Sequence, residues 1–359
     1  MARTVIPFGP QHPVLPEPIH LKLELEDEKV VGVTPVIGYI HRGIEKAAEL
    51  NSFRQNVSLM DRICGICSFI HALTYCQGIE ALMGVEVPPR ARFLRVFWSE
   101  LSRTHSHLLW LGLFADAMGF ESLFMQCWRA REIILDISEM TAGHRIIQST
   151  CTIGGVKRDI DKEMSNEVNR RLLAFKGMMD KTISPVFLHD PTIKRRIAGK
   201  GVLPKEQAEL LGAVGPVARG SGVSIDIRQT GYAAYKEVGF EPVVETAGDG
   251  YARTLVRIRE VYQCLELMPE ALSMMPDGEI LVRVDGYPEG ETVSRCEQPR
   301  GEVIYYLRGN GTNNLERLKI RTPTFANIPA LLATLPGCEL ADVPVLTLLI
   351  DPCISCTER

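Results

Sequence analysis

No stretch of this 359-residue sequence is long and apolar enough to cross a membrane. A spanning helix needs about 20 predominantly apolar residues. The two most apolar stretches, HLLWLGLFADAMGF at 107–120 and VPVLTLLI at 343–350, are too interrupted or too short. Any association with a membrane is therefore expected to come through partner subunits.

The sequence also lacks a basic block and an RNA-type aromatic motif, and its net charge is −4. These absences argue against nucleic acid or an anionic membrane surface as the main partner. The first residues, MARTVIPFGPQHP, do not contain the apolar core of a secretory signal. The ten cysteines are therefore expected to be free or metal-bound thiols in a reducing compartment.

Hydrophobic periodicity predicts a mainly α protein with peripheral β-structure. In HLKLELED (20–27), leucines alternate with polar residues, which is typical of a half-buried strand, and VVGV (30–33) returns the chain after a turn. Longer patterns predict helices at 68–84, 90–118, 121–147, 158–182 and 249–268, with Asp249 as the cap of the last one. Strands are predicted at 279–284 and 303–309, and ordered loops at 215–232.

We expect one α+β domain over residues 1–359, because no repeat, low-complexity tract or clear linker divides the sequence. Its parts are an N-terminal β-hairpin region at 1–40, a helical core at 44–270, and a mixed β and loop region at 275–359. Four cysteines in apolar contexts that look helical are expected to serve plain packing, since free cysteine is among the most buried residue types: Cys76, Cys127, Cys151 and Cys264.

Two Cys-x-x-C pairs stand at opposite ends of the sequence. One lies in RICGICSFIH (62–71) and the other in DPCISCTER (351–359). Four thiolates suit zinc, an iron–sulfur cluster, or nickel with iron. Structural zinc sites usually draw their pairs from knuckles separated by roughly 12–20 residues, whereas 285 residues separate Cys67 from Cys353. A Cys₄ zinc site and a redox metal both remain open, while the missing secretory signal disfavours disulfides.

The two motifs, R-x-C-G-x-C-x-x-x-H and D-P-C-x-x-C, resemble the ligand motifs of [NiFe]-hydrogenase large subunits. The matching residues are Arg62, Cys64, Gly65, Cys67, His71, Asp351, Pro352, Cys353 and Cys356. The resemblance implies that Cys64 and Cys353 are terminal nickel ligands. It further implies that Cys67 and Cys356 bridge nickel to an iron that carries CO and cyanide.

Other segments resemble the quinone-site subunit of respiratory complex I, which shares the hydrogenase fold but lacks the four cysteines. These segments are GPQHP (9–13), HRGIEK (41–46), RGSGVSIDIR (219–228) and GDGYARTLVRIRE (248–260). A chain with both sets of features is similar to the membrane-bound, energy-converting hydrogenases of the Ech type. The resemblance thus implies their fold, with a central bundle of long helices.

The implied cluster carries a net negative charge, so its burial requires compensation. By resemblance, Arg300 in QPRG (298–301) lies beside the open metal positions together with Pro299, and donates to a cyanide nitrogen. Thr324, next to Pro323 in RTPTFAN (321–327), supplies donors to the other cyanide. Arg62, His71 and Asp351 are expected to surround the ligands without binding the metals.

The resemblance also implies a proton route and an electron route. Glu45 in RGIE (42–45) matches the family's proton-transferring glutamate, and we expect burial to raise its pKa. No other cysteine group has iron–sulfur spacing, so [4Fe-4S] clusters are expected only in partner subunits. The implied partners are an iron–sulfur small subunit, a ferredoxin-type carrier, antiporter-like integral-membrane subunits and a maturation protease. The chain is then expected on the cytoplasmic side of the cell membrane, held peripherally by those subunits.

Two departures from the related families limit these expectations. GPQHP continues as VLPEP without the second histidine of the complex I relative, which argues against quinone reduction and leaves His12 and His41 as candidates for coupling or for capping loops. Soluble hydrogenases end their motif with a histidine that binds a magnesium-type ion. Here that position is Arg359, which cannot be a metal ligand, so no such ion is expected. The family's maturation protease cuts just after this position, so a processed C-terminus is one expectation.

Two other functions remain open on the sequence alone. One is a complex I-like sulfane or quinone reductase subunit, which loss of either cysteine pair would favour. The other is a non-catalytic scaffold held by a Cys₄ zinc site. Metal content separates the hydrogenase from the scaffold.

Overall fold

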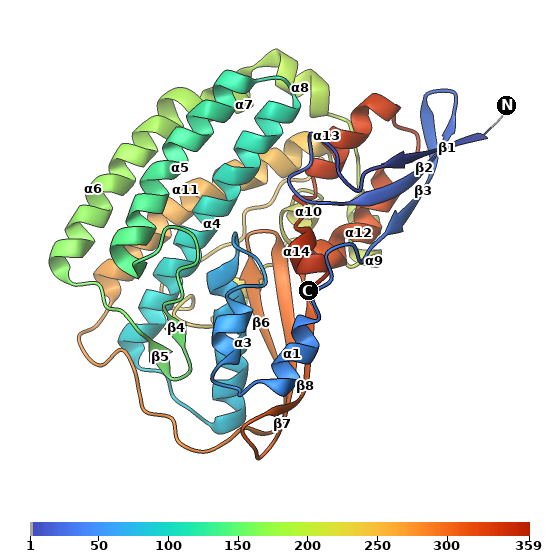
Figure 1. Cartoon of the computed structure of the whole chain (residues 1–359). Helices are drawn as coiled ribbons and strands as arrows, with labels where there is room; N and C mark the ends of the chain where they lie inside the picture. The colour runs from blue at the N-terminus through green and yellow to red at the C-terminus, as the bar shows by residue number, and fades with distance from the viewer. Residues whose placement is uncertain (1–2) are drawn as a thin grey trace.

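Four long helices form a bundle in the computed structural model, which describes residues 3–359 (Figure 1). Their bounds are Pro89–Ala117 for α4, Glu121–Ala142 for α5, Lys162–Met178 for α6 and Gly250–Met274 for α11. Helix α4 packs against both α5 and α11, and α6 contacts α5 and α11. The predicted central bundle of long helices is confirmed.

Local sequence signals set the ends of the helices. Helix α3, at Ser68–Met83, ends at Gly84, whose φ of 62° lies in the left-handed region that favours glycine. Helix α4 begins with Pro89, whose ring suits the first turn. The Asp249 side chain accepts a hydrogen bond from the Ala252 N–H and starts α11, as predicted.

The N-terminal region is a three-stranded antiparallel sheet of β1 (Arg3–Phe8), β2 (His20–Glu26) and β3 (Lys29–Val36). Leu21, Leu23 and Leu25 are buried, so the alternation in β2 reflects its two faces. The predicted β2–β3 pair is confirmed, and β1 joins it as a third strand that the sequence did not predict.

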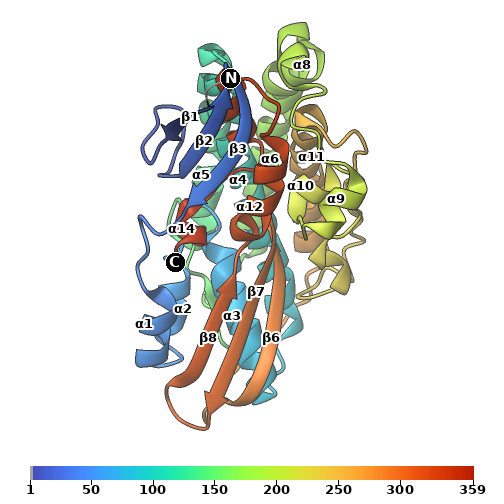
Figure 2. The same cartoon turned by 90° about the vertical axis from the view of Figure 1, so that its right-hand side faces the viewer.

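A second antiparallel sheet packs against α3 (Figure 2). It contains β6 (Glu289–Gln298), β7 (Gly301–Asn310) and β8 (Leu315–Arg321). The strand predicted at 303–309 is confirmed as part of β7. The short turn between β6 and β7 consists of Pro299 and Arg300, which places both residues at the end of the sheet.

Some predicted elements differ from the structure. The helix predicted at 158–182 begins at Lys162, because the Asp161 side chain caps it through the Met164 N–H, and Met179–Ile183 form a π-helical turn. The segment 279–284 is not a strand. It forms only an isolated bridge, from Leu281 to Gly155 in the two-residue strand β5 (Gly155–Val156), and the Val282 N–H donates to the Gly154 carbonyl.

Two further corrections concern single segments. Cys151 is buried as expected, but it lies in the short strand β4 (Cys151–Thr152) rather than in a helix. The region 215–232, predicted as loops, contains α10 (Gly215–Arg219) and a 3-10 turn at Ile227–Thr230. The Asp226 side chain caps that turn in a capping box.

The remaining elements are short. They are α1 (Ile44–Leu50), α2 (Asn56–Met60), β5 (Gly155–Val156), α7 (Ser184–His189), α8 (Pro191–Ile197), α9 (Lys205–Leu210), α12 (Pro323–Thr334), α13 (Val343–Leu348) and α14 (Ile354–Thr357), with a 3-10 turn at Leu340–Asp342. One buried apolar cluster extends from Phe8 in β1 to Cys356 in α14.

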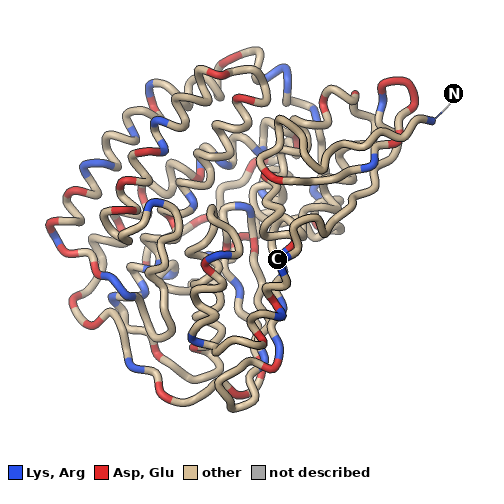
Figure 3. Tube along the Cα trace, viewed as in Figure 1, with Lys and Arg blue, Asp and Glu red and all other residues tan. Residues whose placement is uncertain are grey.

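Charged residues of both signs are interspersed along the trace (Figure 3). Among residues 3–359, no helix has the length and apolar character that crossing a bilayer requires.

Candidate metal centre

The cysteines of the two Cys-x-x-C pairs lie together in the interior. The Sγ atoms of Cys64 and Cys353 are 3.2 Å apart, and those of Cys67 and Cys356 are 3.5 Å apart. The Sγ atoms of Cys64, Cys67 and Cys356 all lie within 4.8 Å of one another. Each of the four residues is at most 3% exposed. The two ends of the sequence therefore meet at one buried site.

Two helix starts present these sulfurs. Cys67 directly precedes α3, and Cys353 directly precedes α14. In Figure 1, α14 lies beside the N-terminal end of α3. The Ile66 N–H donates to Cys64 Sγ at 3.3 Å, so the loop between the first two cysteines also orients its sulfur.

The electrostatics of the four thiols fit a site for positive metal ions. Hydrogen bonds from Cys353, Cys356 and Cys67 hold the pKa of the Cys64 thiol well below its usual value. Burial raises the pKa of the Cys356 thiol well above it. One thiolate thus disfavours a second, and four ionised sulfurs require added positive charge. Soft thiolate donors at these distances suit nickel, iron or zinc.

Arg300 is a buried guanidinium beside this site, held in place by Asp351. Its Nε donates to the Asp351 carbonyl at 2.8 Å, and its Nη2 lies 2.8 Å from the Asp351 carboxylate. Its Nη1 donates to Ser106 Oγ at 3.2 Å. Arg300 is 3% exposed, so its charge acts within the interior. The negative charges of Asp351 and of the cysteines outweigh burial and raise its pKa.

A close backbone contact fixes the turn that carries Arg300 and Pro299. Gly215 has a φ of 65°, and an added Cβ there would lie 2.2 Å from the Arg300 carbonyl oxygen. Only glycine permits this approach. The start of α10 therefore positions the β6–β7 turn.

His71 lies on α3 against the second cysteine pair. Its Nε2 is 3.3 Å from Cys356 Sγ, and its Nδ1 is 2.8 Å from the Tyr305 hydroxyl. Burial lowers the pKa of His71 to about 4, which keeps the ring neutral. A neutral ring that donates a hydrogen bond from Nε2 to the sulfur accepts a hydrogen bond from the Tyr305 hydroxyl at Nδ1.

The other predicted residues divide between interior and surface. Thr324 accepts the Cys353 N–H at 3.1 Å, and the Thr322 hydroxyl donates to the Cys356 carbonyl at 3.1 Å. Pro323 is the buried first residue of α12. Arg62 is exposed and donates to the Ser58 carbonyl, so its side chain points away from the four sulfurs.

Glu17 is a site residue that the sequence did not predict. Its Oε1 lies 3.9 Å from Cys353 Sγ and accepts the Ser355 hydroxyl at 2.6 Å. Its Oε2 accepts the N–H groups of Ile354 and Ser355 at the start of α14. The available signal was its place between Pro16 and Pro18, which fixes a rigid loop rather than a helix or inner strand.

Glu45 has a different environment from the one expected. Burial acts to raise its pKa, but hydrogen bonds from Lys319 and the Ile320 N–H, with the charge of Arg359, lower the pKa below its usual value. The expected rise is therefore wrong. Among residues 3–359, the carboxylate in contact with one of the four sulfurs is that of Glu17.

The Arg359 guanidinium lies between the Glu45 carboxylate and the Ile320 carbonyl. Its Nε lies 3.3 Å from Glu45 Oε1, and its Nη2 donates to the Ile320 carbonyl. The guanidinium thereby joins α1 to the end of β8.

Of the two candidate histidines, His12 caps its own loop, whereas His41 contacts the C-terminal segment. His12 Nδ1 accepts the Val14 N–H at 3.3 Å, and His41 Nδ1 lies 3.0 Å from the Glu358 carbonyl.

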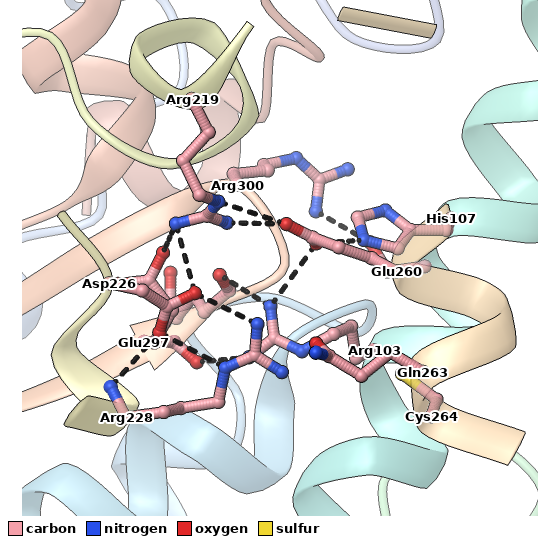
Figure 4. A network of polar contacts seen from close by, with 12 residues as sticks. Arg103, His107, Arg219, Asp226, Arg228, Glu260, Gln263, Cys264, Glu297 and Arg300 are labelled. Atoms are coloured by element: carbon pink, nitrogen blue, oxygen red, sulfur yellow. Dashed lines mark hydrogen bonds and ion pairs between the residues drawn. The ribbon is translucent and has the colours of Figure 1, made fainter. Parts of the chain in front are cut away.

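Figure 4 shows a fully buried network of charged side chains close to Arg300. Arg219 pairs with Glu260 at 2.7 Å, with Glu297 at 2.7 Å and with Asp226 at 3.1 Å. The other members are Arg103, Arg228, Glu100 and His107. Four of these residues come from two segments that carry the complex I resemblance, 219–228 and 248–260. The resemblance marked these segments, but the sequence alone did not predict that their charged side chains meet.

The network contains four carboxyl groups against three guanidinium groups. They are Glu100, Asp226, Glu260 and Glu297 against Arg103, Arg219 and Arg228. Burial, followed by the charge of Asp226, raises the pKa of Glu297 to about 7 despite Arg219 and Arg103. This carboxyl group therefore binds a proton as pH falls below about 7, which reduces the excess negative charge of the network.

The fold and the site define a class of proteins: large subunits in which a long-helix bundle brings two terminal Cys-x-x-C pairs around one metal centre. The family described as "Nickel-dependent hydrogenase" matches residues 42–114. The family described as "Respiratory-chain NADH dehydrogenase, 49 Kd subunit" matches residues 117–287 and 283–359.

Individual relatives agree over nearly the whole chain. The carbon monoxide-induced hydrogenase of Rhodospirillum rubrum is 41% identical, with all of both chains covered. The membrane-bound hydrogenase subunit alpha of Pyrococcus furiosus is 39% identical over 99% of this chain and 87% of the relative. An NADH-quinone oxidoreductase component of Koribacter versatilis is 35% identical over 94% of this chain and 92% of the relative.

The chain belongs to the catalytic large subunits of membrane-bound, complex I-related nickel-dependent hydrogenases.

Proposed function

We propose that this chain catalyses the reversible oxidation of H₂, with Cys64, Cys67, Cys353 and Cys356 holding nickel and an iron that carries CO and cyanide. The observation that carries this proposal is the convergence of the two cysteine pairs beside a buried Arg300. When bound, such a metal pair supplies the Lewis-acid and redox chemistry that splits H₂.

The residues around the cysteines suit an anionic metal group. Arg300 keeps its charge at every working pH and offers N–H donors that Asp351 and Ser106 orient. The neutral ring of His71 contacts the sulfur of Cys356, and the Thr324 hydroxyl orients Cys353 by accepting the Cys353 N–H. Pro299 and Pro323 hold the two turns rigid, and Arg62 contributes its backbone before Cys64.

In our proposal, the proton that H₂ oxidation releases leaves from the sulfur of Cys353. We assign the next step to Glu17, because its Oε1 lies 3.9 Å from Cys353 Sγ. Pro18, the next residue, lines a cavity of about 380 Å³ together with Pro10, Gln11, Tyr39 and Ile40, which gives the proton a way out. Glu45, which the family resemblance selects for this step, is the competing candidate.

The electrons leave through another protein. Gly65 between the first two cysteines is exposed, and Ile146 beside it is 41% exposed. In our proposal an iron–sulfur small subunit binds this face. A cavity of about 360 Å³ adjoins it, lined in part by Arg62, Lys157 and Arg158. These cations favour an anionic partner group such as a [4Fe-4S] cluster held by thiolates.

The remaining partners follow from the relatives. Several of these carry membrane-bound hydrogenase or formate hydrogenlyase names. We propose that antiporter-like integral-membrane subunits hold this chain on the cytoplasmic side of the membrane and couple the reaction to ion translocation. A ferredoxin-type carrier exchanges electrons with the small subunit, and a maturation protease acts on the C-terminal region.

The competing functions differ in the metal that they require. Neither a sulfane reductase nor a quinone reductase of the complex I type requires four intact thiols, and a scaffold with a Cys₄ site requires one zinc. Purification of the chain with its small subunit, followed by metal analysis and an H₂-dependent dye-reduction assay, distinguishes them. Nickel together with H₂ oxidation supports the hydrogenase, whereas stoichiometric zinc without activity overturns it.

A further inference from the structure

Arg42 contacts both ligand-bearing segments at once. Its Nη2 donates to the Ile63 carbonyl at 2.6 Å and to the Ser355 carbonyl at 2.9 Å, and its Nη1 donates to the Arg62 carbonyl at 3.1 Å. Ile63 directly precedes Cys64, and Ser355 lies between Cys353 and Cys356. One side chain thus joins two loops that lie almost 300 residues apart in the sequence.

The chemistry of these contacts requires arginine. Its planar guanidinium offers five N–H donors in a fixed fork, so a single group can serve three carbonyls. A lysine ammonium is a compact point charge on a flexible stem. Gly43, with a φ of 66°, follows Arg42 and directly precedes α1.

The residues just before Arg42 hold the same C-terminal segment. Gly38 N–H donates to Glu358 Oε1 at 2.7 Å, and Ile40 N–H donates to Glu358 Oε2 at 2.5 Å. We call residues 38–42 the strap. The strap therefore binds the C-terminal segment at Ser355 and at Glu358, on both sides of Cys356.

We propose that Arg42 is a positioning residue that closes the C-terminal cysteine pair onto the N-terminal pair, with the strap as its support. The expected consequence is that Arg42 sets the spacing of the four sulfurs before and after metal binding. This consequence rests on the proposed metal centre. The contacts themselves belong to the protein chain and need no metal.

The test uses the full chain produced with and without nickel in the growth medium. The variants are R42Q, which cannot form the fork, and R42K, which keeps only the charge. The control is R54Q, because Arg54 is an exposed arginine that donates to a single carbonyl, that of Val284. Hydrogen exchange reports on residues 354–358, and alkylation reports on Cys353 and Cys356.

We expect R42Q to speed exchange at 354–358 and alkylation of Cys353 by about tenfold or more in the nickel-free chain, since charge-assisted hydrogen bonds are lost. R54Q leaves both rates at the wild-type value, and R42K lies between them. In the nickel-grown protein, R42Q contains less nickel and its metal-ligand infrared bands shift. If R42Q and R54Q have equal exchange and alkylation rates, the proposal is overturned.

This outcome is separate from that of the proposed function. Absence of nickel from the wild-type chain would contradict the hydrogenase assignment but would leave the hydrogen-exchange rates of the variants unchanged. Unchanged exchange and alkylation rates in R42Q, with nickel present in the wild type, would contradict only the role of Arg42.

Discussion

The carboxylate of Glu17 lies 3.9 Å from the sulfur of Cys353, although the two are 336 positions apart in the sequence. The same carboxylate accepts both N–H groups at the start of α14. Glu17 therefore both fixes the C-terminal ligand segment and offers a nearby acceptor for a proton that leaves Cys353. Glu45 forms ion pairs with Lys319 and Arg359 instead.

Replacement of Glu17 tests the proton route. We expect E17Q to retain nickel, because glutamine preserves an oxygen acceptor for α14, but to lose H₂ oxidation by about 100-fold or more, as for loss of a positioned proton carrier. E45Q is the matched comparison. Hydrogen–deuterium exchange from D₂ measures the step without electron transfer. Loss of exchange in E45Q together with near-normal exchange in E17Q would return the role to Glu45.

Arg300 is expected to need its shape as well as its charge. R300K keeps a positive charge but cannot contact Asp351 and Ser106 together. We expect its turnover to fall about 100-fold, in the range for loss of one preorganised donor, with nickel content unchanged. R295K on strand β6 is the control, because Arg295 is exposed and paired with Glu302. Equal activity of R300K and R295K would contradict this role.

The four ligand cysteines are expected to differ from the other cysteines in metal binding. C356S should remove nickel from the purified protein, since a neutral hydroxyl is a poor replacement for a thiolate. C338S should retain it, because Cys338 lies partly exposed beside α12, outside the thiol cluster. Metal analysis of both variants checks the prediction. Full nickel in C356S would show that the metal lies elsewhere.

Glu297 predicts a pH dependence of stability. Its pKa is about 7 in the folded protein against a usual value of 4.5. Between these values the folded chain keeps a proton that the unfolded chain has released. The free energy of unfolding therefore falls as pH rises through this window.

The E297Q variant lacks this group, so its stability should depend less on pH between 4.5 and 7, by roughly 3 kcal/mol. Urea unfolding at several pH values measures the difference from wild type. E316Q removes an exposed carboxyl group as the control. Parallel pH profiles for wild type and E297Q would rule out the raised pKa.

Local patterns in the sequence predicted local structure well. The leucine alternation placed β2, and the helical periods placed the bundle, because both depend on which face is buried. Motif spacing selected the four cysteines that the fold brings together. The strand predicted at 279–284 was wrong because this run meets only the two-residue strand β5, through a single bridge at Gly155, which is too short a partner for a ladder.

Contacts over long sequence separations were not accessible from such patterns. Glu17 sits in a proline-flanked loop between β1 and β2, and its approach to Cys353 depends on how this loop meets the start of α14. The pKa of Glu45 depends on Lys319 and Arg359, which reach it from β8 and the C-terminal segment. Burial alone suggested a raised pKa for Glu45, which is the wrong direction.

Infrared spectroscopy combined with metal analysis of the purified wild-type chain tests the central claim most directly. A hydrogenase centre at the four cysteines predicts one nickel and one iron per chain, with absorption bands from metal-bound CO and cyanide, all of which disappear in C356S. One zinc per chain without those bands would contradict it.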